Sequence, residues 1–166
     1  GLQTWIALPE KNEDMDPAFA NIRSSHLPEY SDNNMAMRVI MGSFAGMKAP
    51  VPTYSETVYV DVRLTAAQPF NLPADIEERA IYILSGEVEI SGDRFGEHRL
   101  LVFKPGDEIV LKAASDSHFM LLGGASIGSK RYIWWNFVSS SLEKIEQAKE
   151  EWRTGRFDIV PGDEDE

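Results

Sequence analysis

Apolar and polar residues alternate through the middle of the chain, which is the pattern of half-buried β-strands. The alternation is clearest over residues 58–64, where valines and a leucine are separated by Tyr59, Asp61 and Arg63. Residues 35–41 show the same period of two. Further short strands are predicted at 80–84, 87–91, 100–103, 108–112, 118–122 and 131–138.

Turn-forming residues separate these predicted strands. Ser85-Gly86, Gly123-Gly124 and the run Lys104-Pro105-Gly106-Asp107 all stand between apolar segments. About eight short strands with no helix between them are typical of a sandwich or a jelly-roll barrel. A parallel α/β sheet is excluded, because its crossovers need helical segments. The predicted fold class is therefore all-β and antiparallel, a sandwich or a jelly-roll barrel.

One C-terminal amphipathic helix follows the predicted barrel. Ser140-x-x-Glu143 has the pattern of a capping box, and Gly155 stands where a helix ends. One face of this helix is apolar, with Leu142, Ile145, Ala148 and Trp152. We expect that face to bury against the barrel or a partner. The opposite face is rich in Glu rather than Lys and Arg, which argues against a membrane-surface role.

The N-terminal part of the chain has a different pattern. Residues 2–8 predict a strand that ends before Pro9, and a polar stretch without clear period follows. Such a strand is unusual beside a long irregular segment inside a compact domain, so we expect it to pair with something outside the chain. Three segments are predicted: 1–34, an N-terminal strand and irregular linking segment; 35–138, the barrel; and 139–166, the helix and an acidic tail.

Composition and charge narrow the classes of function. The formal net charge is -11, from 16 Lys+Arg and 27 Asp+Glu, and a field of that sign repels phosphate backbones and anionic lipids. We therefore expect neither direct nucleic-acid binding nor membrane binding. The chain has no cysteine, which excludes disulfides, thiol nucleophiles and thiolate metal sites. A reducing, cytoplasmic location fits this composition.

Two segments of the predicted barrel carry a family resemblance. Ala80-Ile81-Tyr82-Ile83-Leu84-Ser85-Gly86-Glu87-Val88-Glu89, followed by Phe103-Lys104-Pro105-Gly106-Asp107, resembles the core of a cupin. Leu2 to Pro9 is similar to the segment that links the halves of pirin-like bicupins. Trp135-Asn136-Phe137-Val138-Ser139-Ser140-Ser141, leading into the helix, is similar to the same family. The chain as a whole resembles the C-terminal half of such a protein.

The resemblance implies a two-barrel parent protein. Pirin-like proteins are implied to hold one iron or another divalent metal in the N-terminal barrel. Some members resemble quercetin 2,3-dioxygenases, and animal members are similar to transcription co-regulators. On this basis we expect the chain to pack against a second cupin domain or another copy.

The same resemblance locates where metal ligands would stand in this barrel. The two histidine positions fall on Leu72 and Ala74, and the carboxylate position falls on Glu78. The stretch after the Pro-Gly turn, Ile109-Val110-Leu111, offers no third imidazole. We expect no metal, no cofactor and no catalytic residue in this chain. Glu78 also has a simpler interpretation, as part of a solvated loop before a strand.

The histidines and the large aromatic residues do not suggest another metal site. His26, His98 and His118 are scattered without ligand spacing; His118 is a possible rim residue because its strand could face inward. Trp134, Trp135 and Phe137 could stack on an aromatic ligand. We expect them instead to pack the barrel end against the terminal helix.

Two main hypotheses of function remain. In the first, the chain is a metal-free accessory domain that shapes an active N-terminal cupin, and alone it is not an enzyme. In the second, it is a binding module whose apolar cavity or helix face takes a small aromatic ligand or a protein partner. A metal-independent cupin enzyme fits less well, because no acid–base pair of His and Tyr is apparent.

Overall fold

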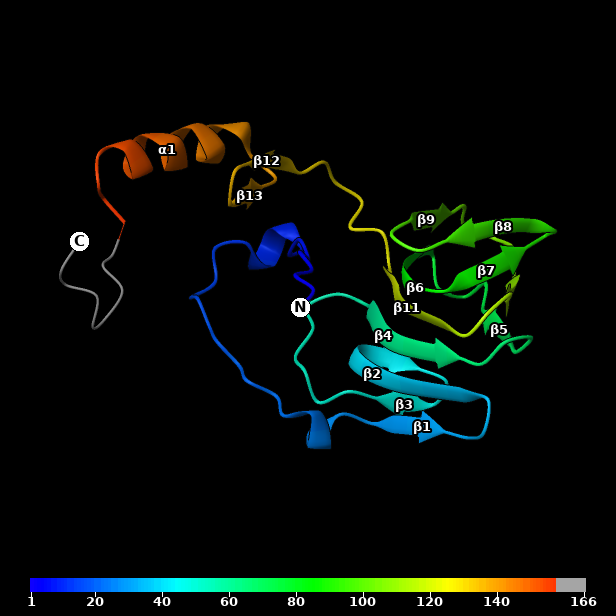
Figure 1. The fold of residues 1–166 in the computed structure, drawn as a ribbon. Coiled ribbons are helices and arrows are strands. Elements are labelled where there is room, and N and C mark those ends of the chain that lie inside the picture. Colours follow the sequence, from blue (N-terminus) through cyan, green and yellow to red (C-terminus); the bar gives the residue numbers. More distant parts are fainter. Residues whose placement is uncertain (158–166) are drawn as a thin grey trace. The chain divides into compact units, whose positions relative to one another are not determined.

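The computed structural model describes residues 1–157 and forms two compact units (Figure 1). The sandwich unit spans Asp16–Ser126. The hairpin–helix unit combines Gly1–Met15 with the chain from Ile127 onward. The predicted acidic tail lies almost wholly in residues 158–166, outside the described residues.

The sandwich unit consists of two antiparallel sheets. The larger sheet has the strand order β1-β2-β4-β11-β6-β9, with β3 paired to β2, and the smaller has the order β5-β10-β7-β8. The larger sheet contains β1 (Glu29–Ser31), β2 (Met35–Phe44), β3 (Met47–Lys48), β4 (Thr57–Leu64), β6 (Glu78–Ser85), β9 (Leu100–Phe103) and β11 (Ser117–Gly124). The smaller contains β5 (Pro69–Leu72), β7 (Glu87–Ile90), β8 (Asp93–Gly96) and β10 (Ile109–Ala113).

The chain passes repeatedly between the two sheets from β4 onward. The strands β4, β6, β9 and β11 belong to the larger sheet, and β5, β7, β8 and β10 belong to the smaller. Every strand pairing is antiparallel, and the connections are short turns in place of helices. This is the connectivity of a jelly roll, so the predicted fold class is confirmed.

The interior of the sandwich unit is apolar, as the alternation in the sequence predicts. Val58, Val60, Val62 and Leu64 of β4 are all buried, whereas the polar residues between them lie on the other face. The same alternation buries Ile81 and Ile83 of β6. Phe119 of β11 contacts Phe70 of β5 edge to face, with ring centroids 5.4 Å apart. These contacts join the two sheets through one hydrophobic core.

Glycine is required at the turn between β6 and β7. Gly86 has φ +82°, and a Cβ atom there would lie 2.2 Å from the carbonyl oxygen of Asp116. The backbone just before β11 therefore approaches this turn more closely than a side chain at this position allows. Among the turns of the sequence motif, this one is fixed by both its conformation and its surroundings.

The hairpin–helix unit contains a short β-hairpin and one α-helix. The strands β12 (Tyr132–Trp134) and β13 (Phe137–Ser139) pair antiparallel, so the single strand predicted over 131–138 is in fact two strands joined at Trp135 and Asn136. The 3-10 helix η1 (Glu10–Asn12) belongs to this unit, and η2 (Ser24–His26) to the sandwich unit. Residues 2–8 form no strand, so that prediction is wrong.

The helix α1 spans Leu142–Arg153, close to the predicted range. The N-cap is Ser141, whose hydroxyl accepts from the Lys144 amide; the predicted capping box on Ser140 is wrong. At the other end Gly155 has φ +66°, and the amide of Arg156 donates to the carbonyl of Glu151 at 2.9 Å. These bonds form the glycine-terminated end that the sequence predicts. No helix among residues 1–157 has the length and apolar character to cross a bilayer.

Candidate functional site

Three of the six predicted ligand positions meet in the interior of the sandwich unit. Leu72 is the last residue of β5, and Ile109 is its cross-strand partner in β10. Leu111 lies on the same face of β10, and both leucines are fully buried. Aliphatic side chains therefore fill this wall of the interior and offer no lone pair to a metal.

The other three positions face away from the interior. Ala74 lies exposed in the turn after β5, and Glu78, the first residue of β6, is exposed as well. Val110 points outward between Ile109 and Leu111 and is half exposed. The structure therefore places Glu78 in solvent at the first position of β6 rather than in a loop before that strand.

The charged side chain that does enter the interior is Arg79. It precedes Ile81 and Ile83 on the inward face of β6, and only 2% of it is exposed. Its guanidinium donates to the carbonyl oxygens of Leu72 (3.3 Å), Pro73 (2.9 Å) and Lys104 (3.1 Å). The Nε atom is buried without a hydrogen-bond partner, and no carboxylate of residues 1–157 forms an ion pair with this arginine.

Arg79 is a residue that the sequence reasoning missed. The signal was present, because residues 79, 81 and 83 share one face of a strand with period two. The family resemblance puts Glu78 at the ligand position, whereas the pleat of β6 turns its neighbour Arg79 inward. Among the described residues, no three His, Asp or Glu side chains lie close enough together to hold a metal ion.

His118 lines a polar groove at one end of the larger sheet, away from the apolar interior. The groove encloses about 330 Å³, and Asp32, Arg63, Ser85 and Asp116 also line it. The Nε2 atom of His118 lies 3.0 Å from Oδ2 of Asp61 on the neighbouring strand β4. His118 is therefore held by a carboxylate on the outer face of the larger sheet and does not face inward, so its place on a rim stays a prediction.

The two carboxylates that line this groove already accept hydrogen bonds from neighbouring residues. Oδ1 of Asp32 accepts from the amides of Asn34 and Met35, and Oδ2 accepts from the Tyr30 hydroxyl. These hydrogen bonds, the Asn34 amide foremost, lower the pKa of Asp32. Oδ1 of Asp116 accepts from the amide of Ala66 at 2.8 Å. The polar groups of this groove are thus hydrogen-bonded to one another, as in a capped turn.

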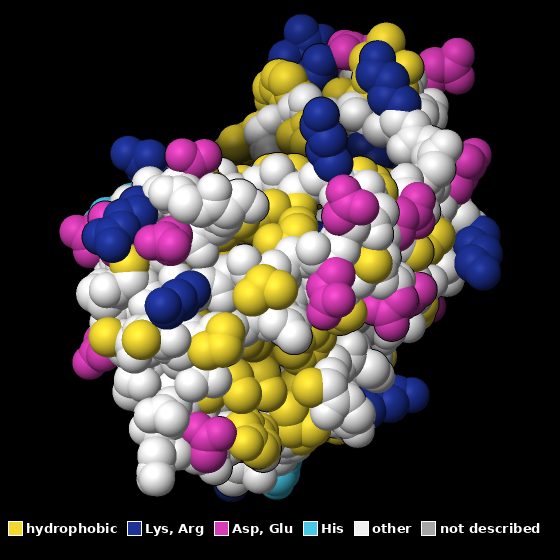
Figure 2. Space-filling model, turned by 90° about the vertical axis from the view of Figure 1, so that its right-hand side faces the viewer, with side chains coloured by type: hydrophobic (Ala, Val, Ile, Leu, Met, Phe, Trp, Pro, Cys, Tyr) yellow, Lys and Arg dark blue, Asp and Glu magenta, His cyan; other side chains and the backbone are white. Residues whose placement is uncertain are grey.

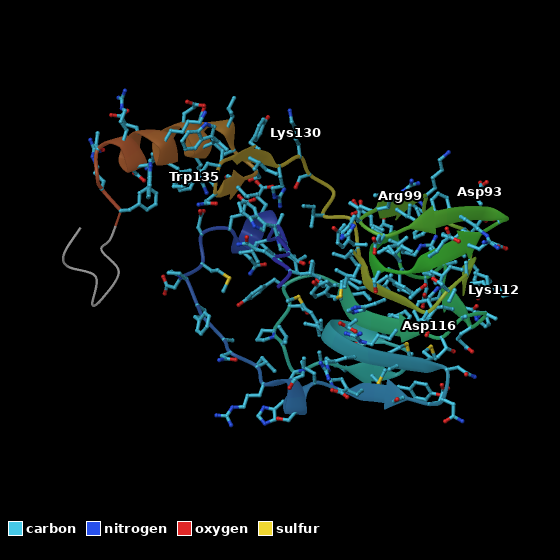
Figure 3. The ribbon with its side chains drawn as sticks, in the orientation of Figure 1. Asp93, Arg99, Lys112, Asp116, Lys130 and Trp135 are labelled. Carbon is cyan, nitrogen blue, oxygen red and sulfur yellow. The ribbon has the colours of Figure 1, made fainter. Side chains whose placement is uncertain are left out.

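The hairpin–helix unit carries an aromatic cluster, defined here as Trp134, Trp135, Phe137, Trp152 and Phe157. The rings of Trp135 and Trp152 meet edge to face with centroids 4.7 Å apart, and Phe137 stacks on Phe157 at 5.4 Å. The cluster joins the hairpin to α1, as Figure 3 shows for the labelled Trp135. The sequence predicts that residues 134, 135 and 137 pack the barrel end against the terminal helix; the structure shows the rings of Trp135 and Phe137 in contact with Trp152 and Phe157 within the hairpin–helix unit.

The aromatic cluster is only partly covered. Trp135 is 53% exposed and Trp152 is 51% exposed, although each contacts the other. Of the apolar face of α1, only Ile145 is buried, whereas Leu142 is half exposed. A contiguous exposed surface of this kind is typical of a site of interaction.

A buried ion pair connects the N-terminal segment to the hairpin. Oε1 of Glu13 lies 2.9 Å from Nε of Arg131, and both side chains are nearly buried. Glu13 also accepts from the amide and hydroxyl of Ser140 and from the hydroxyl of Ser139. Burial opposes ionisation of Glu13, but these hydrogen bonds and the charge of Arg131 together hold its pKa below the usual value.

The comparisons with known proteins agree on one family. The model of the pirin C-terminal cupin domain matches residues 59–158. A pirin-like protein of Caulobacter vibrioides is 43% identical over 96% of this chain and 55% of its own length. Pirin of Homo sapiens is 28% identical over 94% of this chain and 56% of its own.

A solved structure gives the same result for the fold. The quercetin 2,3-dioxygenase of Acinetobacter baumannii superimposes with a TM-score of 0.83 and 26% identity, over 95% of this chain and 54% of that protein. The chain thus spans about half the length of the relatives that it matches.

Proposed function

The chain belongs to the pirin family as its C-terminal cupin domain, and we propose on this basis that it is an accessory domain without chemistry of its own. In this proposal it packs against a metal-binding N-terminal cupin and holds that domain in shape. The activity, metal and substrate would then be properties of the two-domain protein. A cytoplasmic location is part of the proposal and is supported by the absence of cysteine from the sequence.

The observation that carries the proposal is the filling of the interior at the ligand positions. Leu72, Ile109 and Leu111 occupy the inward positions, and the one polar group among them is the Arg79 guanidinium. A guanidinium donates hydrogen bonds but has no lone pair to give, and its fixed charge repels a divalent cation. The residues of this interior therefore do not fit a metal ion, and no step of catalysis is assigned to them.

The exposed apolar surface supports a packing role. The aromatic cluster of the hairpin–helix unit is half exposed, and in the sandwich unit the edge strand β9 exposes Leu100 and Val102. Figure 2 shows hydrophobic side chains at the surface between charged ones on the face that it presents. Covering such residues in an interface removes apolar area from water, which stabilises association. A second cupin domain is the partner that we propose.

For the two-domain protein we propose a dioxygenase-like activity. The support is the solved structure named quercetin 2,3-dioxygenase, of which the match with this chain covers 54%. In this proposal iron or another divalent metal, held by the other domain, would supply the site at which dioxygen and a flavonol react. The present chain would contribute a rigid surface beside that domain.

Metal analysis tests this proposal directly. The purified 166-residue chain, incubated with Fe²⁺, Ni²⁺ or Zn²⁺ and desalted, is expected to retain no stoichiometric metal and to leave quercetin intact. The matched sample joins this chain to the N-terminal half of the Caulobacter relative and is expected to retain one metal per molecule. One equivalent of metal on the chain alone, together with cleavage of quercetin, would show that the accessory role is wrong.

A second candidate function is a binding module that uses the helix face. The half-exposed Trp135 and Trp152 favour this surface over the interior, which is filled by aliphatic side chains. A small aromatic ligand or an aromatic side chain of a partner protein could stack on these rings. Thermal-shift screening with flavonols and small aromatics tests it, with the Trp135→Ala/Trp152→Ala variant as the control. A shift of the melting temperature that disappears in the variant would favour this candidate.

A further inference from the structure

Two connections between the sheets lie next to each other at one end of the sandwich unit. Residues 73–77 lead from β5 in the smaller sheet to β6 in the larger, and residues 104–108 lead back from β9 to β10. Leu72 is paired with Ile109 across β5 and β10, and Arg79 with Phe103 across β6 and β9. Both connections therefore begin and end at paired residues, and they close the same end of the interior.

These two connections carry the same sign of charge. The first, with the start of β6, contains Asp75, Glu77 and Glu78, and the second contains Asp107 and Glu108. All five carboxylates are exposed, and Lys104 is the one exposed cation among them. Like charges held side by side repel one another, and salt screens this repulsion. A contact that joins the two connections beyond the strand pairing would offset this repulsion.

Arg79 is placed to do this. Its guanidinium donates to Leu72 and Pro73 at the start of the first connection and to Lys104 at the start of the second. It does so from inside the sandwich, where only 2% of the side chain is exposed. The contacts are made to backbone oxygens, so the arginine fixes the path of the chain rather than the position of another side chain.

We infer that Arg79 is a latch that joins the two connections and closes this end of the interior. Its positive charge offsets the acidic character of both connections from beneath. Its planar fork of donors reaches carbonyl groups on both sides at once, which a single ammonium group does less well. Loss of the side chain would remove the three hydrogen bonds that join the two connections, so the end would open locally.

The latch is independent of the proposed accessory function. It concerns the stability of one end of the sandwich unit, whether or not a second domain is present. Metal retention tests the accessory function, and local opening tests the latch. Failure of one is therefore distinguishable from failure of the other.

Hydrogen exchange followed by mass spectrometry tests the latch. In Arg79→Met, backbone amides in peptides covering 69–82 and 100–111 are expected to exchange at least tenfold faster than in the unchanged chain. Exchange over β2 and β4 is expected to stay the same. The increase is expected to be larger at low salt than at 0.5 M salt, because the repulsion between the acidic connections is then unscreened.

The matched control is Arg94→Met. Arg94 of β8 is an exposed arginine that pairs with Glu87 and Glu89 on the surface, so its loss is expected to leave both peptides unchanged. Folded Arg79→Met with unchanged exchange in both peptides, or with an increase in one alone, would overturn the latch.

A second variant covers the case in which Arg79→Met does not fold. Arg79→Lys keeps the charge but not the fork, and it is expected to speed exchange several-fold in both peptides. Exchange in Arg79→Lys equal to that of the unchanged chain would overturn the latch just as clearly.

Discussion

The sandwich unit and the hairpin–helix unit are stabilised in different ways. The sandwich unit buries a continuous set of aliphatic and aromatic side chains between two sheets. In the helix of the hairpin–helix unit only Ile145 is buried, and the aromatic cluster remains half exposed. That unit depends instead on the pair between Glu13 and Arg131 and on the hydrogen bonds of Ser140. One unit is held by a closed hydrophobic core, and the other by a half-exposed aromatic cluster together with a polar connection to the N-terminal segment.

This difference indicates where a partner would act. A unit whose apolar side chains are already buried gains little stability from an interface with a partner. A unit with exposed tryptophans gains much more, because the interface removes their apolar surface from water. The difference also supplies a probe, because all four tryptophans, Trp5, Trp134, Trp135 and Trp152, lie in the hairpin–helix unit. Tryptophan fluorescence therefore reports that unit alone.

The largest effect is expected from a cavity in the sandwich core. Phe119→Ala removes a fully buried ring that packs against Phe70, so we expect a loss of about 3–5 kcal/mol in the free energy of unfolding. Chemical denaturation followed by far-ultraviolet circular dichroism measures it. Val102→Ala is the control, since Val102 is 74% exposed and should change stability by less than about 0.5 kcal/mol. Equal losses in the two variants would contradict a stabilising core.

A smaller effect is expected from the polar connection of the hairpin–helix unit. Glu13→Gln leaves Arg131 without its countercharge and turns an amide group toward donors, so we expect about 2–3 kcal/mol of lost stability in this unit. Unfolding followed by tryptophan fluorescence measures it. Asp14→Asn removes the exposed pair with Lys144 and should cost at most about 0.5 kcal/mol. Equal losses of stability in the two variants would show that burial of the Glu13 pair does not stabilise the unit.

The smallest effect is expected from acid. The folded-state pKa of Glu13 is lowered from the usual value of 4.5, so its contribution is fully present above that value and is lost as pH falls through the lower, folded pKa. Tryptophan fluorescence in an acid titration should show the hairpin–helix unit weakening only below about pH 4.5. Glu13→Gln should lack this step. A step of the same size in Glu13→Gln would assign it to other carboxylates.

Much of the sandwich could be predicted because alternation in a strand is a local property. The valines of β4 and the isoleucines of β6 indicate which face of each strand is buried, and this follows from their immediate neighbours alone. The strands β1 and β3 were missed because they are only three and two residues long, β5 because it begins with Pro69, and β8 because Phe95 is its one apolar side chain. Segments this short carry too few positions to define a period.

The ligand positions show the limit of counting along a motif. The family resemblance puts Glu78 at the carboxylate position, but a shift of one residue in a strand moves a side chain to the opposite face. The structure turns Arg79 inward and leaves Glu78 in solvent. The predicted N-cap is wrong for a different reason: Ser140 is bound to Glu13, and Ser141 caps the helix in its place.

The sequence by itself determined the antiparallel barrel, the terminal helix with its glycine stop, and the absence of histidine from the positions where the family resemblance places ligands. These features depend on residue type and on neighbours a few positions away. Only the tertiary structure decided that the Arg79 side chain donates to the backbone of Lys104, 25 residues away, and that Glu13 meets Ser140 across 127 residues. Contacts between residues so far apart in the sequence depend on how the sheets and turns pack. Such packing produces no periodic pattern in the sequence, so these contacts could not be predicted from it.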